Sequence, residues 1–321
     1  MTEDVPSEVL RAFGMQDAAM ERIEQGLVNK HWALELSGRR YVLCRYHARR
    51  AREAILWEQW LVDFAEKLGW PVAKPVPAGD GEPLVEHGGR FWAAAPLLPG
   101  TPGGGSTPSA FRRMGETLAE LHDNLSGLGG PQRPGFGPAW DLDTLVQQWG
   151  AASFDALVEQ LGTTRPDLAE LIRNERVRNL RDLEMGGVEH LPLLPIHGDF
   201  HRFNLLWDGA RITGIVDWDY SRRDVLIADL APLLEPFMPL EFELAKSLLE
   251  GYHSVRPLSG RERRLLIPMV RAGLLWWVAT LLAEWGGSGE LPAGIERTIT
   301  VRWPALEAAA PEYEAMLAEL A

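Results

Sequence analysis

The sequence predicts an α+β fold in two lobes, a small one built on an antiparallel sheet with a helix and a larger, mainly helical one. Residues 20–95 contain short segments that alternate apolar and polar side chains, as strands do, around one amphipathic helix. The stretch 96–106, PLLPGTPGGGS, is dominated by Pro and Gly and breaks this pattern. Most of 107–321 then has helical periodicity. We therefore predict an N-terminal lobe at 1–95, a hinge and linker at 96–106 and a C-terminal lobe at 107–321.

Individual elements follow from periodicity and from capping residues. In the N-terminal lobe we expect a leading helix at 6–20 with Ser7 as its N-cap, strands between 20 and 46, a helix at 49–67, and strands near 76, at 84–85 and at 91–95. The last strand leads to the linker and is expected at the edge of the sheet. In the C-terminal lobe we expect helices at 111–125, 155–184, 239–253, 259–285 and 292–308, a last helix from Pro311, and an irregular insertion at 127–150.

Composition narrows the class of protein. With 46% hydrophobic and 24% charged residues, the chain of 321 residues resembles an ordinary globular protein. Cys44 is the only cysteine, which excludes an internal disulfide and a cysteine-cluster metal site. The net charge of −13 argues against a nucleic-acid partner. We find no apolar run of membrane-spanning length and an acidic N-terminal segment, so we expect a cytoplasmic protein without a membrane partner.

The segment 197–207, HGDFHRFNLLW, has the composition of a catalytic loop followed by a strand. Asp199 and Asn204 are five positions apart, and a short apolar strand at 212–216 leads directly to Asp217. Phosphoryl transfer depends mainly on positioning and on neutralising phosphate charge, so one Asp to accept a hydroxyl proton, with an Asn and an Asp as Mg²⁺ ligands, is a sufficient set. The pattern therefore predicts that Asp199 accepts the proton of the substrate hydroxyl and that Asn204 and Asp217 bind the metal.

These motifs, in this order, resemble the aminoglycoside phosphotransferase and choline kinase-like family of small-molecule kinases. The resemblance rests on His197-Gly198-Asp199 with Asn204, on Val216-Asp217-Trp218 and on Asp229-Leu230-Ala231. It implies a two-lobed protein-kinase-like fold, with ATP and Mg as cofactors and a small hydroxyl compound as acceptor. The sequence resembles homoserine kinases of this type most, at residues 26–29 and 251–259 as well as around the catalytic loop.

The resemblance also implies roles for residues that bind the nucleotide. Gly26 and Asn29 match a loop over the phosphates, Glu58 or Glu53 matches a helix carboxylate that pairs with a strand cation, and the backbone near Ala94 and Pro96 would bind the adenine. The position of that cation is occupied by Cys44. Arg45 follows it, and strand alternation predicts that Arg45 points to the opposite face unless a bulge turns it inward.

Further roles follow for the catalytic loop and the acceptor site. Arg202 is expected to steer a phosphate or a substrate carboxylate, and His197 to brace the loop. Asp229 is expected to hold the loop backbone, whereas His122 is expected to be structural and remote from it. Asp219, His201, Trp276 and Trp277 are candidates to contact the acceptor.

The sequence leaves the acceptor and the oligomeric state open. The acceptor is a homoserine-like amino alcohol, an aminoglycoside or a sugar. A nucleotide-binding pseudokinase with a regulatory role is the alternative, supported by Cys44 and opposed by the intact Asp199, Asn204 and Asp217. A protein kinase ranks third, because the chain has no glycine-triplet loop and only a short segment between Asp217 and Asp229.

Overall fold

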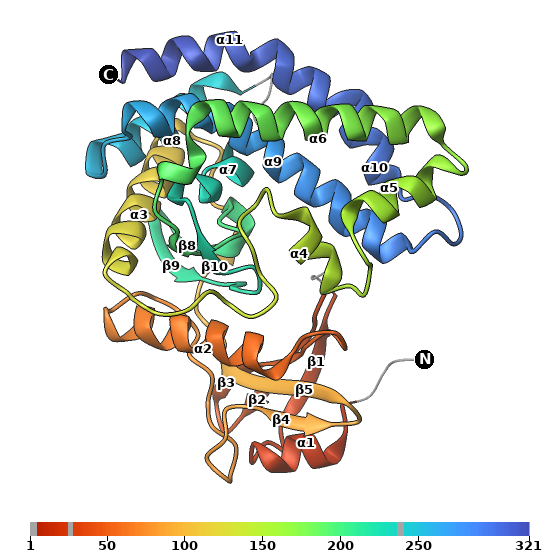
Figure 1. Cartoon of the computed structure of the whole chain (residues 1–321). Helices are drawn as coiled ribbons and strands as arrows, with labels where there is room; N and C mark the ends of the chain where they lie inside the picture. Colours follow the sequence, from red (N-terminus) through yellow and green to blue (C-terminus); the bar gives the residue numbers. More distant parts are fainter. Residues whose placement is uncertain (1–4, 25–27, 236–240, 321) are drawn as a thin grey trace. The chain divides into compact units, whose positions relative to one another are not determined.

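The computed structural model describes residues 5–24, 28–235 and 241–320, and the chain divides into two compact units (Figure 1). The first unit contains the residues up to Pro102 together with Leu205–Val216. The second contains Gly103–Asn204 and Asp217–Ala321. The hairpin at 205–216 therefore groups with the first unit, although it lies within the predicted range 107–321. The domain boundaries themselves stay a prediction.

The first unit is built on an antiparallel five-stranded sheet in the order β1-β2-β3-β5-β4. Its elements are α1 (Ser7–Ala12), β1 (Ala19–Ile23), β2 (Lys30–Leu36), β3 (Arg39–Arg45), α2 (Arg52–Lys67), β4 (Val85–His87) and β5 (Arg90–Pro96). One face packs on α1 through Val9, Trp32 and Leu43, and the other packs on α2 through Ile55 and Ala93. The alternation of side chains along each strand produces these two separate cores.

Three expectations for this unit are wrong. Strand β5 is not at an edge, because a turn at Gly88 and Gly89, both with positive φ, folds β4 back along its free side. The leading helix ends at Ala12 rather than near Met20, and Gly14, with φ of 67°, lies just beyond its end. Pro6, not Ser7, precedes the first turn as the N-cap.

A second, three-stranded sheet has the order β6-β8-β9, and it belongs to the first unit as well. Its strands are β6 (Thr101–Pro102), β8 (Leu205–Asp208) and β9 (Arg211–Ile215). Gly100 enters this sheet with φ of 116°, and a Cβ there would lie 2.4 Å from Thr213 Oγ1. Only glycine fits this position.

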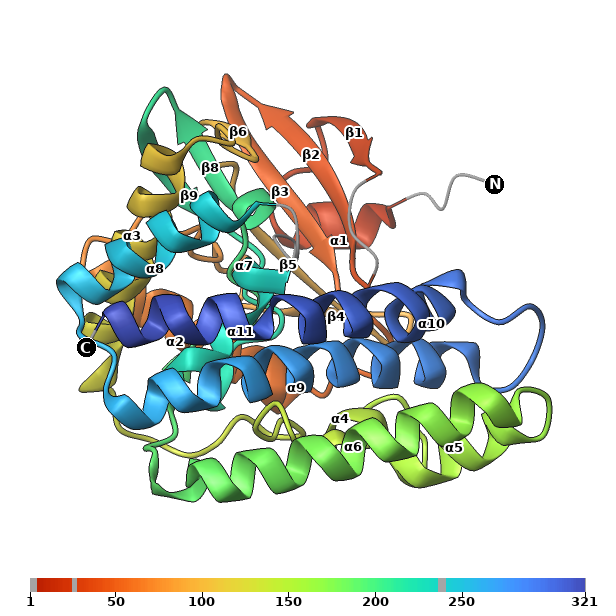
Figure 2. The same ribbon diagram turned by 90° about the horizontal axis from the view of Figure 1, so that it is seen from above.

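The second unit is mainly helical. Its helices are α3 (Pro108–Ser126), α4 (Leu142–Gln147), α5 (Phe154–Gly162), α6 (Pro166–Gly186), α7 (Ala231–Leu234), α8 (Phe242–Val255), α9 (Gly260–Trp285), α10 (Ala293–Arg297) and α11 (Trp303–Glu319), and its two strands are β7 (Leu194–Ile196) and β10 (Arg222–Asp224). Helices α6, α9 and α11 lie side by side (Figure 2). The predicted start of α8 at Pro239 lies outside the described residues, and α11 continues through Pro311 instead of breaking before it.

Helices α3 and α8 cross at unusually short range, because each has a glycine at the contact. A Cβ on Gly115 would lie 2.0 Å from the carbonyl oxygen of Leu248, and a Cβ on Gly251 would lie 2.2 Å from that of Arg112. The two backbones touch where neither residue has a side chain. This contact fixes the position of α8 against α3.

Helix α9 begins with a capping box, in which Ser259 and Glu262 each bind the other's backbone N–H. Over an 18-residue window its mean hydropathy is 1.8, so by length and composition it could cross a membrane. The expectation that no apolar run reaches that length is therefore wrong. In this structure 72% of the window is buried inside the protein, as is usual for the central helix of a helical domain.

Candidate active site

The predicted catalytic loop, 197–204, connects the buried strand β7 to β8 and lies in the second unit. Strand β7 pairs with β10, which brings the loop beside the segment 217–221. Gly198 has φ of 83°, and a Cβ there would lie 1.9 Å from the carbonyl oxygen of Tyr220. A residue with a side chain at position 198 would separate these two segments.

Within the loop, Asn204 holds Asp199. The Asn204 amide nitrogen donates to the backbone oxygen of Asp199 at 2.9 Å and to its carboxylate Oδ2 at 3.0 Å. Neither bond uses the amide oxygen of Asn204 or Oδ1 of Asp199. Burial raises the pKa of Asp199 to about 7; the Asn204 hydrogen bond opposes this rise, and the negative charges of Asp229 and Asp219 add to it.

The backbone of the loop is anchored by Asp229, which is fully buried. Its carboxylate accepts hydrogen bonds from the backbone N–H of His197 at 2.8 Å and of Gly198 at 2.6 Å. His122 Nε2 donates a third bond to it at 3.1 Å. The expected role of Asp229 is thus matched by its contacts, whereas the expectation that His122 lies remote from the loop is wrong.

His197 is buried and packs against the rings of Phe200 and Trp218, at centroid distances of 5.7 and 4.6 Å. Its Nδ1 accepts a bond from the backbone N–H of Asp199 at 3.3 Å. These contacts are those of a side chain that braces the loop.

Asp217 follows β9 after one intervening residue, and it has a φ of 64°, a left-handed conformation that is uncommon for a residue with a side chain. The segment after it is held by Arg133, only 1% exposed, whose guanidinium donates to the backbone oxygens of Asp219 at 2.8 Å and Ser221 at 2.9 Å. Arg133 comes from the irregular insertion, and its local sequence, PQRPG, carries no signal of burial. Sequence reasoning missed it for that reason.

Two further loop residues, Arg202 and His201, were predicted to belong to the site. Arg202 donates to Ser106 Oγ at 2.8 Å and lies over the ring of Phe203, which is 58% exposed. His201 Nε2 lies 3.6 Å from Asp199 Oδ2. The geometry therefore brings His201 next to the predicted acceptor of the proton, whereas the contacts of Arg202 are with Ser106 and Phe203.

Of the two tryptophans predicted to contact the acceptor, the structure brings only Trp276 to this region. Its ring packs edge-on against Tyr220, with centroids 4.7 Å apart. Trp277 points toward Gly294 near α10, where its Nε1 would lie 3.7 Å from an added Cβ. Consecutive residues of a helix point about 100° apart, so both could not face the same segment.

The predicted nucleotide residues lie in the first unit. Gly26 lies outside the described residues. Asn29 is buried and accepts a bond from the backbone N–H of His47 at 2.9 Å. Glu58 is also buried and accepts a bond from the Tyr46 hydroxyl at 3.0 Å.

The strand residues expected near the nucleotide alternate between the two faces of the sheet. Arg45 lies 5.7 Å from the ring centroid of Trp92, on the face covered by α1, and Cys44 packs on the face covered by α2. The carbonyl of Ala94 already accepts from Val76 N–H, and Pro96 has no N–H to donate.

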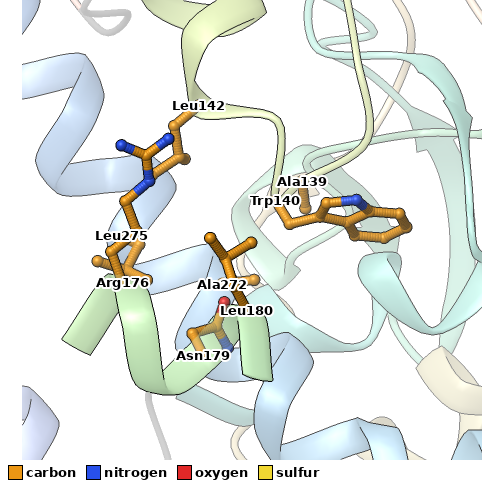
Figure 3. A pocket seen from close by; sticks show the side chains of 8 residues that line it. All are labelled: Ala139, Trp140, Leu142, Arg176, Asn179, Leu180, Ala272 and Leu275. Carbon is orange, nitrogen blue, oxygen red and sulfur yellow. The ribbon is translucent and has the colours of Figure 1, made fainter. Parts of the chain in front are cut away.

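A separate recess in the second unit contains none of the predicted site residues (Figure 3). It has no enclosed space for a water-sized molecule. It is lined by Ala139, Trp140, Leu142, Arg176, Asn179, Leu180, Ala272 and Leu275. Arg176 pairs with Asp143 and Asp155, so the recess is not a candidate for the chemistry.

Comparison with known proteins gives a consistent picture. Residues 19–266 match the model of the Phosphotransferase enzyme family. The chain is 26% identical over 300 residues to a homoserine kinase of Phenylobacterium zucineum, with 92% of this chain and 88% of the relative covered. It is 29% identical over 268 residues to a homoserine kinase of Xanthobacter autotrophicus, with 82% and 79% covered.

Solved structures show the same fold. A microcompartment-associated aminopropanol kinase matches with a TM-score of 0.71 at 20% identity, over 98% of each chain. The amicoumacin kinase hAmiN, in complex with AMP-PNP, Ca²⁺ and Ami, matches with a TM-score of 0.67 at 16% identity, over 94% of this chain and 88% of the other. The predicted kinase-like fold, with an antiparallel sheet followed by a mainly helical part, is confirmed.

Proposed function

Because the chain belongs to the Phosphotransferase enzyme family and is a small-molecule kinase, we propose that it transfers the γ-phosphate of ATP to the hydroxyl group of a small amino alcohol of the homoserine type. The observation that carries this proposal is the arrangement of Asp199 and Asn204. A carboxylate with one oxygen fixed by an amide and the other open is suited to accept a hydroxyl proton.

The donor set fits a magnesium ion. Asn204 offers an amide oxygen that its bonds to Asp199 leave unused, and Asp217 offers a carboxylate. Within 5–24, 28–235 and 241–320, no group of three or more His, Cys, Asp or Glu side chains could hold a metal by itself. A magnesium ion needs no such group, since it binds through one or two protein oxygens plus phosphate and water. When bound, it would neutralise phosphate charge.

The residues of the chain account for the rest of the reaction. Asp199 accepts a hydrogen bond from the acceptor hydroxyl through Oδ1 and takes its proton as the hydroxyl oxygen attacks the γ-phosphorus. The bond from that phosphorus to the β,γ-bridging oxygen breaks in the same step, and ADP leaves. Asn204 keeps Oδ2 in place, so the open oxygen has a fixed direction. Arg202, three residues after Asp199 in the same loop, is available to a phosphate oxygen or to a substrate carboxylate if it leaves Ser106.

The surroundings favour an acceptor with a positive amino group. The carboxylates of Asp199 and Asp219 and the paired rings of Tyr220 and Trp276 attract cations. The relatives named homoserine kinase support an amino alcohol over a sugar. The identities below 30% leave the choice among amino alcohols to experiment.

The test is Mg²⁺-dependent release of ADP from ATP in the presence of homoserine, 1-amino-2-propanol, choline, sugars and aminoglycosides. One amino alcohol should stimulate release, and Asp199→Asn should lower kcat by about 10²- to 10⁴-fold. The control is Asp123→Asn, the same change at an exposed position of α3, which should behave as the unmodified protein. Stimulation by an aminoglycoside or sugar alone would contradict the proposed acceptor. Nucleotide binding without transfer to any compound would favour the pseudokinase alternative.

A further inference from the structure

We propose that Tyr252 and Arg256, at the end of α8, are positioning residues for the catalytic loop and act on it through His122 and Asp229. This inference rests on the proposed function, since it concerns the residue that would accept the proton.

A continuous series of hydrogen bonds leads from α8 to the loop. Arg256 Nη1 donates to the Tyr252 hydroxyl at 3.2 Å, and this hydroxyl contacts His122 Nδ1 at 2.8 Å. His122 Nε2 contacts Asp229 Oδ2 at 3.1 Å. Asp229 then accepts from the backbone of His197 and Gly198. All of these residues belong to the second unit.

The donors and acceptors along this series agree in direction. The ionised Asp229 carboxylate only accepts, so His122 Nε2 is the donor to it, and in the neutral imidazole Nδ1 is then an acceptor. The Tyr252 hydroxyl therefore donates its one proton to His122 Nδ1 while its oxygen accepts from Arg256. Every bond therefore depends on the one before it, and removing the hydroxyl leaves His122 Nδ1 without its donor.

Burial makes such a loss expensive. Tyr252, His122 and Asp229 are each 0% exposed, so water does not replace a missing partner. The glycine contact between α3 and α8 fixes the distance between the helices that carry His122 and Tyr252. Arg256 is itself held by Glu262 at 2.7 Å. The position of the loop backbone is thus tied to the end of α8.

The second unit contains a matched tyrosine that separates this role from packing. Tyr313 is 1% exposed and its ring packs on Phe242, but among the residues that the structure describes its hydroxyl has no hydrogen-bond partner. Changing Tyr to Phe at position 252 or 313 removes the same atom from a buried ring. Only the change at 252 removes a bond of the series.

The experiment compares Tyr252→Phe, Arg256→Gln and Tyr313→Phe in the full chain. Hydrogen exchange of the His197 and Gly198 amides is measured without substrate, and kcat and KM are measured with the acceptor found above. Tyr252→Phe should speed exchange of these amides and lower kcat, each by about tenfold, with both KM values within about twofold. Arg256→Gln should act in the same direction, and Tyr313→Phe should change neither readout.

The outcomes decide between positioning and packing. A folded Tyr252→Phe protein with unchanged exchange at 197–198, or with faster exchange and unchanged kcat, overturns the proposal. If Tyr252→Phe does not fold, Arg256→Gln carries the test, because Arg256 is 23% exposed and lies at the helix end. Unmodified protein without kinase activity would refute the proposed function instead, and the exchange measurement would still test the hydrogen-bond series.

Discussion

The crossing of α3 and α8 predicts that Gly115→Ala destabilises the second unit. The added Cβ would lie 2.0 Å from the carbonyl oxygen of Leu248 and 2.7 Å from the backbone nitrogen of Tyr252. Real Cβ atoms essentially never lie closer than 3.0 Å to such an atom, so the helices must separate by at least about 1 Å.

The size of the effect follows from three contributions. Alanine in place of glycine inside a helix gains about 1 kcal/mol. Overpacking a helix contact typically costs 1–3 kcal/mol, and a backbone contact has no side chain that could move aside. A separation of about 1 Å also stretches the 2.8 Å bond between His122 and Tyr252 beyond hydrogen-bond range, which costs about 1–3 kcal/mol in a buried site. We expect a net loss of about 3 kcal/mol.

Urea unfolding, followed by tryptophan fluorescence and by circular dichroism, measures this loss. The control is Gly127→Ala at the end of the same helix, where φ is −76° and an added Cβ meets nothing within 4 Å. It should be neutral or slightly stabilising. If Gly115→Ala changes the free energy of unfolding by less than about 0.5 kcal/mol, the close backbone contact is not what holds the two helices.

Three further predictions concern the loops of the site. Asp229→Asn replaces an acceptor by a donor opposite buried N–H groups and should cost about 3 kcal/mol at pH 7. Burial raises the pKa of Asp229, but the hydrogen bonds from His122 and from the loop outweigh burial and hold this pKa below the ordinary 3.8. The contribution of the Asp229 carboxylate to stability is therefore present above about pH 4 and is lost as the pH falls through the lowered pKa. In urea titrations the free energies of unfolding of the unmodified protein and of Asp229→Asn should become equal in acid. Arg133→Met leaves buried carbonyls without donors and should lower both stability, by about 3 kcal/mol, and kcat/KM, whereas Arg264→Met at an exposed site should do neither. Gly198→Ala should abolish activity, because its Cβ meets a backbone carbonyl, while Gly209→Ala, with a similar positive φ but open space around it, should cost only about 1 kcal/mol and retain kcat.

Local spacing was sufficient to predict that the polar residues of the loop lie at the ends of short strands. Asp199, Asn204 and Asp217 lie within one short segment, and the strand that leads to Asp217 has its own apolar signature. Asp229 was also expected to hold the loop backbone, and its bonds match that expectation. Their assigned roles in catalysis stay predictions that the experiments above address.

What the sequence could not supply depends on contacts between distant segments. Nothing near Arg133 indicates that it would be buried under residues 218–221, and nothing near His122 indicates its bonds to Asp229 and Tyr252, more than 100 positions away. The prediction that 91–95 forms an edge strand was wrong for a related reason. Sequence gives each strand but not its neighbours, so the three-residue β4 was not expected to cover the side of β5.

The hairpin of β8 and β9 sets the spacing of the two proposed metal ligands. Asn204 precedes it and Asp217 follows it, separated from the paired residues Leu205 and Ile215 by no more than one position. Changing the length of either strand would shift one ligand past the other. The tip is different: residues 208–211 are exposed, and Gly209 has open space around it. An inserted peptide tag, or new chain termini made at 209–210, would leave the ligand spacing intact, so the hairpin tip is a suitable point for engineering this enzyme.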